Sequence, residues 1–320
     1  MSAYSRRVPG RKLGPGGAVD DLMTPTACDE PVRLRRSPVA AYLELTKPRQ
    51  TALLMTTAAG AYLMAATDGV SWAVFVPAMF AMCAAVSGST ALNMAFDRDI
   101  DARMSRTAAR PIPAGEIAPA AALVFGIALS TVGVAVSWVL DPLYGLIIIA
   151  GLGFDVVVYT MWLKRRTPAS ILVGGISGGM PALAGRALAT GSLDAVGFLL
   201  AAGVVLWIPA HILTLATRHA AEYEAAGIPV WPSVYGAECT RRLVAAATLG
   251  AVVVLVLAGV VQRITPLALV GLGFAGTLMT GFAFWTVIAP SERKNWVLFK
   301  AASAYMLFAF VCLTAGSVLR

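Results

Sequence analysis

The chain has 320 residues, of which 58% are hydrophobic and only 13% are charged, and its mean hydropathy is +0.76. A soluble globular protein of this length does not bury that much apolar surface, so the composition predicts a polytopic membrane protein. The apolar runs are long and lack the two-residue alternation of barrel strands, which favours an all-α fold of transmembrane helices.

Residues 1–40 are rich in Gly, Pro and Arg and contain no apolar run long enough for the core of a signal peptide. We expect them to form a disordered cytosolic tail. The remainder, residues 41–320, is predicted to be one transmembrane domain. It begins near Thr46-Lys47-Pro48-Arg49, where Pro48 suits the first turn of a membrane helix.

Nine apolar stretches are long enough to span a membrane, at 50–67, 72–96, 118–138, 143–161, 168–188, 195–217, 243–262, 265–288 and 295–316. If the N-terminus is cytosolic, 22 of the 25 Lys and Arg residues fall on the cytosolic side, as the positive-inside rule requires. This orientation places the C-terminus outside the inner (plasma) membrane of a bacterial cell. The net charge of +8 thus follows from topology, with membrane lipid as a contact and no nucleic acid needed as a partner.

The second span ends in Asn93-Met-Ala-Phe-Asp97-Arg-Asp99-Ile-Asp101. Asn93, Asp97 and Asp101 recur every four residues, so on a helix they share one face, where the carboxylates of the two aspartates repel each other. Hard oxygen ligands at this spacing suit Mg²⁺, which commonly bridges to substrate phosphates. Asp99 points off this face and is predicted to be solvated or paired with an arginine.

A structural ion-pair cluster is the alternative for this segment. Arg103, Arg106 and Arg110 follow the acids closely and would neutralise them without any metal. We favour the metal–phosphate site, because ionisable groups that follow a very apolar run are costly and usually functional.

Two polar segments on the cytosolic side, about 97–117 and 218–242, are the long loops in which we expect the active site. In the second, Glu222 is a candidate ligand for a second metal ion, with a solvated helix end as the alternative, whereas Glu224 is predicted to be solvated. His211 lies near the cytosolic end of the sixth span, where hydrogen-bonded packing and a ligand role both fit.

The fourth span closes with Tyr159-Thr160-Met-Trp-Leu-Lys164-Arg165-Arg166. Basic residues at a helix end satisfy the helix dipole and the topology, and directed inward they would also bind a diphosphate. The spacing leaves both uses open. Arg186, near the outer end of the fifth span, is expected to extend to the lipid headgroups. The five glycines of that span favour close helix packing over a ligand cavity.

Several segments between residues 45 and 236 resemble, in order and spacing, the UbiA superfamily of intramembrane prenyltransferases. They are Thr46-Lys47-Pro48-Arg49, Asn93 with Asp97 and Asp101, Arg106-Thr-Ala-Ala-Arg110-Pro111, Tyr159-Thr160 with Leu163-Lys164-Arg165-Arg166-Thr167-Pro168, Pro181 with Gly185, and Ala226-Gly227-Ile228-Pro229. The segments around Arg106 and Lys164 are most similar to the branch of the superfamily that acts on heme.

The resemblance implies a nine-helix bundle with a cap of cytosolic loops over the site. It implies that Asn93, Asp97 and Asp101 hold Mg²⁺ and, with Lys164, carry the catalysis. The remaining cations on the diphosphate would be Lys47, Arg103, Arg106, Arg110 and Arg165. Tyr159 and His211 would lie on the side of the acceptor.

The resemblance also implies a reaction, in which the farnesyl group of farnesyl diphosphate passes to a vinyl group of heme b on the route to heme A. Heme b is then a substrate rather than a cofactor, and a heme A synthase is a candidate partner. A quinone precursor, another aromatic ring or a lipid alcohol is the alternative acceptor. A transporter or non-catalytic scaffold is a third reading, but it leaves the order of acids, arginines and lysines unexplained.

The chain departs from the heme-branch pattern at a few positions. Ala221 precedes Glu222 where two successive aspartates are usual, so one acid is missing. Ser170 and Arg186 stand where Asn and Trp are usual, and Ile212 and Leu213 replace the aromatic residues that usually follow the histidine. These differences concern the second metal site and the acceptor, and the first motif is intact.

Overall fold

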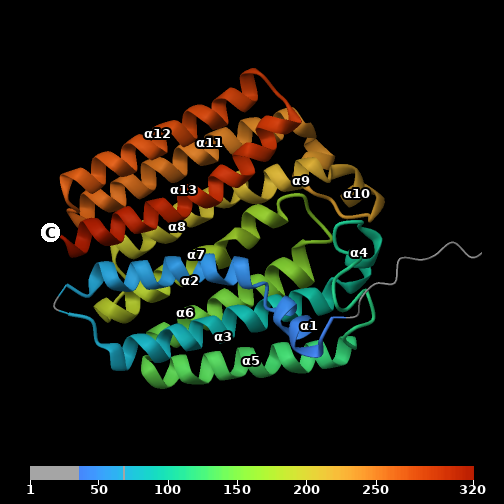
Figure 1. The fold of residues 1–320 in the computed structure, drawn as a ribbon, viewed down its shortest axis with the longest axis horizontal. Coiled ribbons are helices and arrows are strands. Elements are labelled where there is room, and N and C mark those ends of the chain that lie inside the picture. Colours follow the sequence, from blue (N-terminus) through green and yellow to red (C-terminus); the bar gives the residue numbers. More distant parts are fainter. Residues whose placement is uncertain (1–35, 68) are drawn as a thin grey trace, which may run out of the picture. The chain divides into compact units, whose positions relative to one another are not determined.

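The computed structural model describes residues 36–67 and 69–320, and Arg36–Arg320 form one compact unit. All regular secondary structure in these residues is helical (Figure 1). The helices are α1 (Pro38–Leu45), α2 (Pro48–Ala65), α3 (Trp72–Phe96), α4 (Arg98–Arg103), α5 (Pro119–Leu140), α6 (Pro142–Leu152), the π-helix η1 (Gly153–Leu163), α7 (Ser170–Thr190), α8 (Ala195–Ile208), the π-helix η2 (Pro209–Leu213), α9 (Thr214–Arg218), α10 (Ala220–Ala225), α11 (Trp231–Gln262), α12 (Pro266–Ile288) and α13 (Glu292–Val318).

Eight helices of the described chain are long and apolar enough to cross a membrane, counting α6 with η1 and α8 with η2 and α9 as single spans. The protein is therefore an all-helical, polytopic integral membrane protein. The first predicted span corresponds to α2, which has 18 residues but is too polar to be counted among the eight. Its polarity includes the buried Thr51 and Thr57, which face neighbouring helices rather than lipid.

The predicted spans and the observed helices agree within about three residues, with one exception. The span expected at 243–262 belongs to α11, which begins at Trp231 and bends at Gly236, where φ is +80°. The second of the two predicted polar loops is therefore shorter than expected. The polar residues 238–242 misled the prediction, because they lie on a helix that extends beyond the apolar stretch.

Proline and capping side chains explain where several helices start. Helices α2, α5, α6 and α12 begin with a proline, whose missing N–H costs nothing in the first turn. Asp141 and Asp194 cap α6 and α8, each accepting a hydrogen bond of 2.7 Å from a backbone N–H three residues on.

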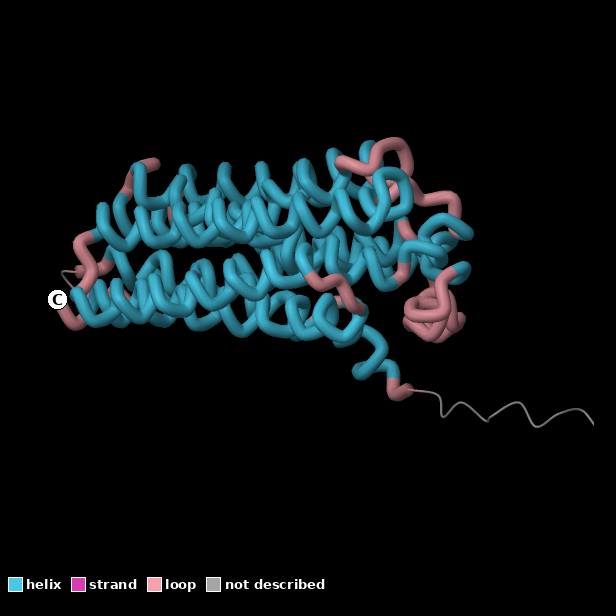
Figure 2. Tube along the Cα trace, turned by 90° about the horizontal axis from the view of Figure 1, so that it is seen from above, coloured by secondary structure: helices cyan, strands magenta, loops and turns pink. Residues whose placement is uncertain are grey.

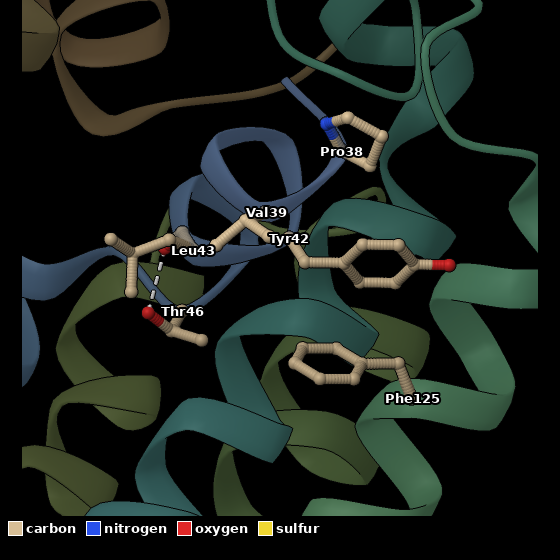
Figure 3. A pocket seen from close by; sticks show the side chains of 6 residues that line it. All are labelled: Pro38, Val39, Tyr42, Leu43, Thr46 and Phe125. Atoms are coloured by element: carbon tan, nitrogen blue, oxygen red, sulfur yellow. Dashed lines mark hydrogen bonds between the residues drawn. The ribbon is translucent and has the colours of Figure 1, made fainter. Parts of the chain in front are cut away.

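Helix α1 corrects the expected extent of the N-terminal tail. Residues 1–35 lie outside the described residues, but the chain is helical from Pro38, because Ser37 caps the helix and accepts a hydrogen bond from the Ala40 N–H. Tyr42 packs edge-on against Phe125 of α5, with ring centroids 5.0 Å apart. These rings line an apolar hollow of about 380 Å³ between α1 and α5 (Figure 3). This packing fixes the segment that leads into Lys47.

Glycines let the central helices approach closely. A Cβ atom on Gly179 of α7 would lie 2.7 Å from the backbone oxygen of Ala201 in α8, and one on Gly133 of α5 would lie 2.6 Å from that of Ala81 in α3. The glycines of α7 thus serve helix packing, as predicted. Helices α2 and α7 contribute side chains to both of the larger apolar cores, so they form the middle of the bundle.

The connections that carry polar residues gather at one end of the bundle. Helices α4 and α10 lie at this end, which we call the cap end, and the C-terminus lies at the opposite end (Figure 1). Figure 2 shows the bulkiest loop segments at the same cap end. The two long loops predicted from the sequence therefore lie over one mouth of the bundle.

Candidate functional site

Asn93, Asp97 and Asp101 lie at the cap end, where α3 passes into α4. Backbone N–H groups of Asp97 and Asp101 donate to the carbonyls four residues earlier, at 2.9 and 2.8 Å, so the helical path continues through the junction. All three side chains are buried, with 8%, 5% and 4% of their surfaces exposed. The i→i−4 hydrogen bonds thus continue through Asp97, whereas a role of the three side chains as ligands of one cation stays a prediction.

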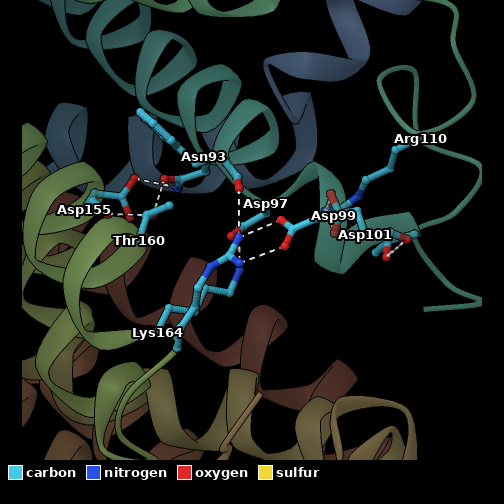
Figure 4. Close-up of polar contacts among 11 residues, drawn as sticks. Asn93, Asp97, Asp99, Asp101, Arg110, Asp155, Thr160 and Lys164 are labelled. Atoms are coloured by element: carbon cyan, nitrogen blue, oxygen red, sulfur yellow. Dashed lines mark hydrogen bonds and ion pairs between the residues drawn. The ribbon is translucent and has the colours of Figure 1, made fainter. Parts of the chain in front are cut away.

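Each acid of the motif meets a cation (Figure 4). Asp97 forms an ion pair with Lys164, and Asp101 accepts bonds of 2.8 and 2.7 Å from one Arg110 nitrogen. Asp99 points away and pairs with Arg165 at 2.8 and 2.6 Å, on a half-exposed surface. The hydrogen bond with Arg165 lowers the pKa of Asp99 to about 2. Asp99 is thus arginine-paired, as expected, and Arg165 is engaged outside the buried motif.

The π-helix η1 brings Lys164 to the buried acids. Lys164 lies nine positions after Asp155, and along an α-helix two residues that far apart would face about 180° away from each other. A π-helix has about 4.4 residues per turn, so nine residues make about two full turns. The i→i+5 pattern persists to the end of the segment, where the Lys164 N–H donates to the Tyr159 carbonyl at 2.8 Å. Asp155 and Lys164 therefore both face α3.

Asp155 is a member of the site that the sequence reasoning missed. Its Oδ2 accepts hydrogen bonds from Asn93 Nδ2, at 2.8 Å, and from the Ser89 hydroxyl. The Thr160 hydroxyl lies within hydrogen-bond distance of Asn93 Oδ1 (Figure 4). An acid inside an apolar span is expensive and usually functional, and this signal was available in the sequence.

Lys47 reaches the same cluster from the turn between α1 and α2. It is one of only two non-glycine residues with positive φ in the described chain, at φ 44° and ψ 66°. Burial, together with the nearby charges of Arg110 and Lys164, lowers the pKa of its ammonium group to about 8, although Asp155 and Asp97 oppose the shift. Lys47 therefore lies near enough to these charges for them to act on its pKa, and its role as a diphosphate-binding cation stays a prediction.

Three of the predicted diphosphate-binding cations, Arg103, Arg106 and Arg165, form no ion pair with the buried Asp97 or Asp101. Arg103 and Arg106 are exposed, and neither forms an ion pair within the part of the chain that the structure describes. Arg103 is the last residue of α4, and Arg106 lies in the segment that follows this helix. Arg110 and Lys164 are the predicted cations that pair with the buried acids, and Lys47 is close enough to Asp97 for the two charges to interact.

Glu222 ties the two cap loops together. Its Oε2 accepts hydrogen bonds of 2.8 Å from both the backbone N–H and the hydroxyl of Ser105, and its Oε1 lies 2.9 Å from His219 Nδ1. The hydrogen bonds from His219 and Ser105 lower the pKa of Glu222 to about 2. Among the described residues no three His, Cys, Asp or Glu side chains form a metal-binding group, and the carboxylate of Glu222 is bound by Ser105 and His219. Glu224 is exposed, as predicted.

His211 belongs to a stack of rings in the second half of the bundle. It lies between Trp207 and Phe299, at centroid distances of 5.0 and 4.6 Å and nearly parallel to both, and its Nδ1 is 3.2 Å from the Ser303 hydroxyl. Tyr159 lies under the Lys164 ammonium group, which is 5.6 Å from the ring centroid. The partners Trp207 and Phe299 were not predicted, because apolar helices carry many aromatic residues.

Arg186 does not extend to the headgroups. It is 8% exposed and donates to Asp194 at 3.0 and 2.7 Å and to Gln262 Oε1 at 3.0 Å. Gln262 in turn donates to the Met64 carbonyl at 2.7 Å. The arginine therefore joins α7, α8, α11 and α2 at the end away from the cap. A buried partner on another helix explains why snorkelling was the wrong expectation.

The buried motif has the donors that a hard divalent cation requires. Asp97 Oδ1 is buried and has no hydrogen-bond partner among the described residues, although its other oxygen pairs with Lys164. A buried carboxylate oxygen without a partner is costly, and a metal ion would satisfy it. With the Asn93 amide and the Asp101 carboxylate, the oxygen donor set fits Mg²⁺. Lys47, Lys164 and Arg110 beside it could bind phosphate oxygens.

The fold and the site together define an intramembrane helical protein with a buried oxygen-rich, cationic site at its cap end. A family model, the UbiA prenyltransferase family, matches residues 53–311. Among curated relatives, the protoheme IX farnesyltransferase of Desulforudis audaxviator is 39% identical and covers 89% of this chain and 90% of its own. That of Archaeoglobus fulgidus is 38% identical and covers 86% and 97%. The chain belongs to the UbiA prenyltransferase family.

Solved structures agree with this assignment at the level of the fold. A structure of digeranylgeranylglyceryl phosphate synthase superimposes with a TM-score of 0.74 at 17% identity, covering 88% of this chain and 99% of that one. A UbiA homolog from Archaeoglobus fulgidus bound to GPP and Mg²⁺ gives 0.63 at 13% identity, covering 85% and 99%. The helical arrangement expected from the motifs is therefore confirmed as UbiA-like.

Proposed function

We propose that this chain transfers the farnesyl group of farnesyl diphosphate to a vinyl group of heme b, giving heme O. The observation that carries the proposal is the buried Asp97, which meets Lys164 with one oxygen and leaves the other without a partner. This carboxylate lies inside a helical bundle. The relatives named protoheme IX farnesyltransferase match this chain over 90% and 97% of their own lengths. The name of these relatives supports a farnesyl donor and a heme acceptor.

Asn93, Asp97 and Asp101 would hold Mg²⁺ in this proposal. When bound, the ion offsets the negative charge that develops on the diphosphate as it leaves. Lys164, Lys47 and Arg110 bind the diphosphate oxygens, Arg110 through its planar fork and the lysines as point charges. Arg103 and Arg106, which are exposed at the rim, meet the diphosphate as it enters.

The reaction begins when the bond between the allylic carbon and the diphosphate oxygen breaks. The leaving group takes the electron pair, and the fixed cations stabilise it as its charge grows. The vinyl group of heme b then donates its π electrons to the farnesyl cation. Water adds to the resulting carbocation beside the porphyrin ring and loses a proton, which leaves a hydroxyethylfarnesyl substituent. The apolar bundle delays the entry of water until the carbon–carbon bond has formed.

The acceptor side of the site is the ring stack around His211. Trp207, His211 and Phe299 present nearly parallel planes, which suit a flat aromatic ring system such as a porphyrin. Tyr159, the other residue expected on the acceptor side, packs its ring against Gly174 of α7, and the Lys164 ammonium group lies 5.6 Å from the ring centroid. A heme bound along the stack would bring a vinyl group towards the diphosphate site.

We extend the proposal to topology and place. Helix α2 begins at the cap end and the C-terminus lies at the opposite end, so an odd number of crossings is required (Figure 1). Counting α2 with the eight apolar spans gives nine. The basic residues then put the N-terminus in the cytoplasm and the C-terminus outside, in a bacterial inner membrane. A heme A synthase in that membrane is the partner expected to take up the product.

The proposal is tested by incubating membranes that contain the full chain with farnesyl diphosphate and heme b, and analysing extracted hemes by mass spectrometry. Heme O should form only when both substrates and Mg²⁺ are present. A parallel incubation replaces heme b with a quinone precursor or a lipid alcohol. Farnesylation of either of these, with heme b left unmodified, would contradict the assignment of the acceptor.

A further inference from the structure

The carboxylate of Asp155 makes hydrogen bonds that have no role in the proposed reaction. Its carboxylate accepts two hydrogen bonds, from Asn93 Nδ2 and from the Ser89 hydroxyl, and both reach the same oxygen, Oδ2. Ser89 and Asn93 are four residues apart on α3, so Asp155 meets one face of that helix. That face continues to Asp97. Asp155 therefore stands directly behind the first residue of the motif.

The side-chain amide of Asn93 has two ends of opposite character. Its nitrogen only donates and its oxygen only accepts, and an ionised carboxylate only accepts. Facing Asp155, the amide must therefore present its nitrogen, because a rotated amide would place two acceptor oxygens against each other. The amide oxygen is then turned towards Thr160, whose hydroxyl can donate to it. Thr160 can also accept a hydrogen bond, so only Asp155 imposes the direction.

This direction decides what Asn93 offers to a ligand. A carbonyl oxygen has two lone pairs, so Asn93 Oδ1 can accept from Thr160 and still bind a hard cation. The reversed amide would present an NH₂ group, which cannot bind a cation. The π-helix η1 makes the arrangement possible, because it turns Asp155, Thr160 and Lys164 towards α3 together.

We propose that Asp155 is a positioning residue, which orients Asn93 so that the amide oxygen faces the divalent-cation site. This inference rests on the proposed function, because it takes Asn93 as a ligand of that cation. Groups that orient a metal ligand typically change metal affinity or activity by about 10- to 100-fold when they are removed.

Two other roles for Asp155 would give different results on substitution. As a direct ligand, or as a counter-charge for Lys47, it would act through its negative charge. As a positioning residue it acts through one acceptor oxygen. Asp155→Asn keeps one carbonyl oxygen, which can accept from both Asn93 and Ser89, and removes the charge. Asp155→Leu removes the charge and the acceptor in a side chain of similar size.

The experiment measures Mn²⁺ binding to the detergent-purified full chain, by the electron paramagnetic resonance signal of the free ion. We expect Asp155→Leu to raise the dissociation constant about 10- to 100-fold and Asp155→Asn to stay within about threefold of the wild type. Ser89→Ala is the matched control, since it removes the other hydrogen bond to Oδ2 and leaves the contact with Asn93; it too should stay within about threefold. Thermal unfolding checks each variant, and Asp155→Ala replaces the leucine variant if that variant does not fold.

Wild-type affinity for Mn²⁺ in Asp155→Leu would overturn the inference. An equal loss of affinity in Asp155→Asn and Asp155→Leu would also overturn it, because the negative charge rather than the acceptor oxygen would then be the property that matters. Failure of the proposed metal site looks different. In that case the wild type and Asp97→Ala would bind Mn²⁺ equally weakly, whatever stands at position 155. The third outcome is that the wild type binds Mn²⁺, that Asp97→Ala does not, and that the Asp155 variants bind it as the wild type does. This outcome would overturn the positioning role of Asp155 and leave the metal site standing.

Discussion

Lys47 stands out at the scale of single residues because its backbone is strained. Its φ of 44° lies in the left-handed region, and it directly precedes Pro48, which normally holds the preceding residue in an extended conformation. Such strain costs on the order of 1–3 kcal/mol and persists where the surroundings impose it. Here α1, packed on α5, and the start of α2 hold the turn. The ammonium group that this turn carries is buried, near the charges of Arg110, Asp155 and Asp97.

The charge on Lys47 makes the reaction depend on pH. Its pKa is lowered to about 8 by burial, so the free enzyme loses this cation as the pH rises through 8. We expect kcat/KM for farnesyl diphosphate to fall there, by up to about tenfold per pH unit. Lys47→Arg keeps its charge, and its kcat/KM should stay level over the same range. An identical fall in that variant would assign the pH dependence to another group.

The effect of Lys47 on stability has the opposite sign. The unfolded chain keeps the ordinary lysine pKa of 10.5, so between pH 8 and 10.5 the unfolded state holds more protons than the folded state. Stability attributable to Lys47 therefore rises with pH in this window, while activity falls. Thermal unfolding and kcat/KM measured on the same samples separate a loss of charge from a loss of fold.

At the scale of elements, the π-helix η1 sets the register of the site. Deleting Val157, which is 56% exposed on the lipid-facing side, shortens the segment by one residue and favours an ordinary α-helix. Asp155 and Lys164 then turn away from a common face. We expect turnover to fall by roughly 100-fold or more, since displacements of about 1 Å at an active site already have effects of that size.

The control for this deletion is Val157→Ala, which removes most of the same side chain and keeps the register. It should retain turnover and insert normally into membranes. Full activity in the deletion variant would show that the register of η1 does not matter.

The link between the cap loops through Glu222 is a second property of elements. Glu222→Ala removes the acceptor for the Ser105 N–H, so hydrogen exchange at Ser105 should accelerate and KM for farnesyl diphosphate should rise. The Mg²⁺ dependence should not change, because Glu222 is not grouped with the buried acids. Glu224→Ala, at an exposed neighbouring position, is the matched control. A shifted Mg²⁺ requirement in the Glu222 variant would restore the second metal site.

The Glu222 contact also has a defined pH range. Its pKa falls from the ordinary 4.5 to about 2, so the stability it contributes is fully present above pH 4.5 and is lost as the pH falls towards 2. The link between the loops therefore stays intact at neutral pH.

Elements could be predicted from the sequence where their position depends only on residues within one helix. Span positions and the common face of Asn93, Asp97 and Asp101 follow from hydropathy and from helical periodicity, which are local properties. The π-helix was out of reach, because an α-helical period puts Asp155 and Lys164 on opposite sides. The prediction that Arg186 extends to the headgroups was wrong for a related reason. Its partner Gln262 lies 76 residues away in the sequence, and no local pattern indicates this contact.

At the scale of the whole molecule, the number of crossings fixes which side of the membrane each terminus faces. We predict nine crossings, so alkaline phosphatase fused after Arg320 should be active in a bacterial host, whereas a green fluorescent protein fused there should be dark. The same reporters placed in the loop between η1 and α7 should give the reverse pattern. A fluorescent C-terminal fusion would mean an even number of crossings and would exclude α2 as a span.

The central claim is that Asp97 serves cleavage of the diphosphate, and pyrophosphate release tests it most directly. The purified full chain in lipid, supplied with farnesyl diphosphate and heme b, should release pyrophosphate in a Mg²⁺-dependent manner. The release rate of Asp97→Ala should be lower than that of the wild type by a factor of about 100 or more, with unchanged thermal unfolding. Asp99→Ala should release pyrophosphate at the wild-type rate. Wild-type release by a folded Asp97→Ala variant would contradict the account.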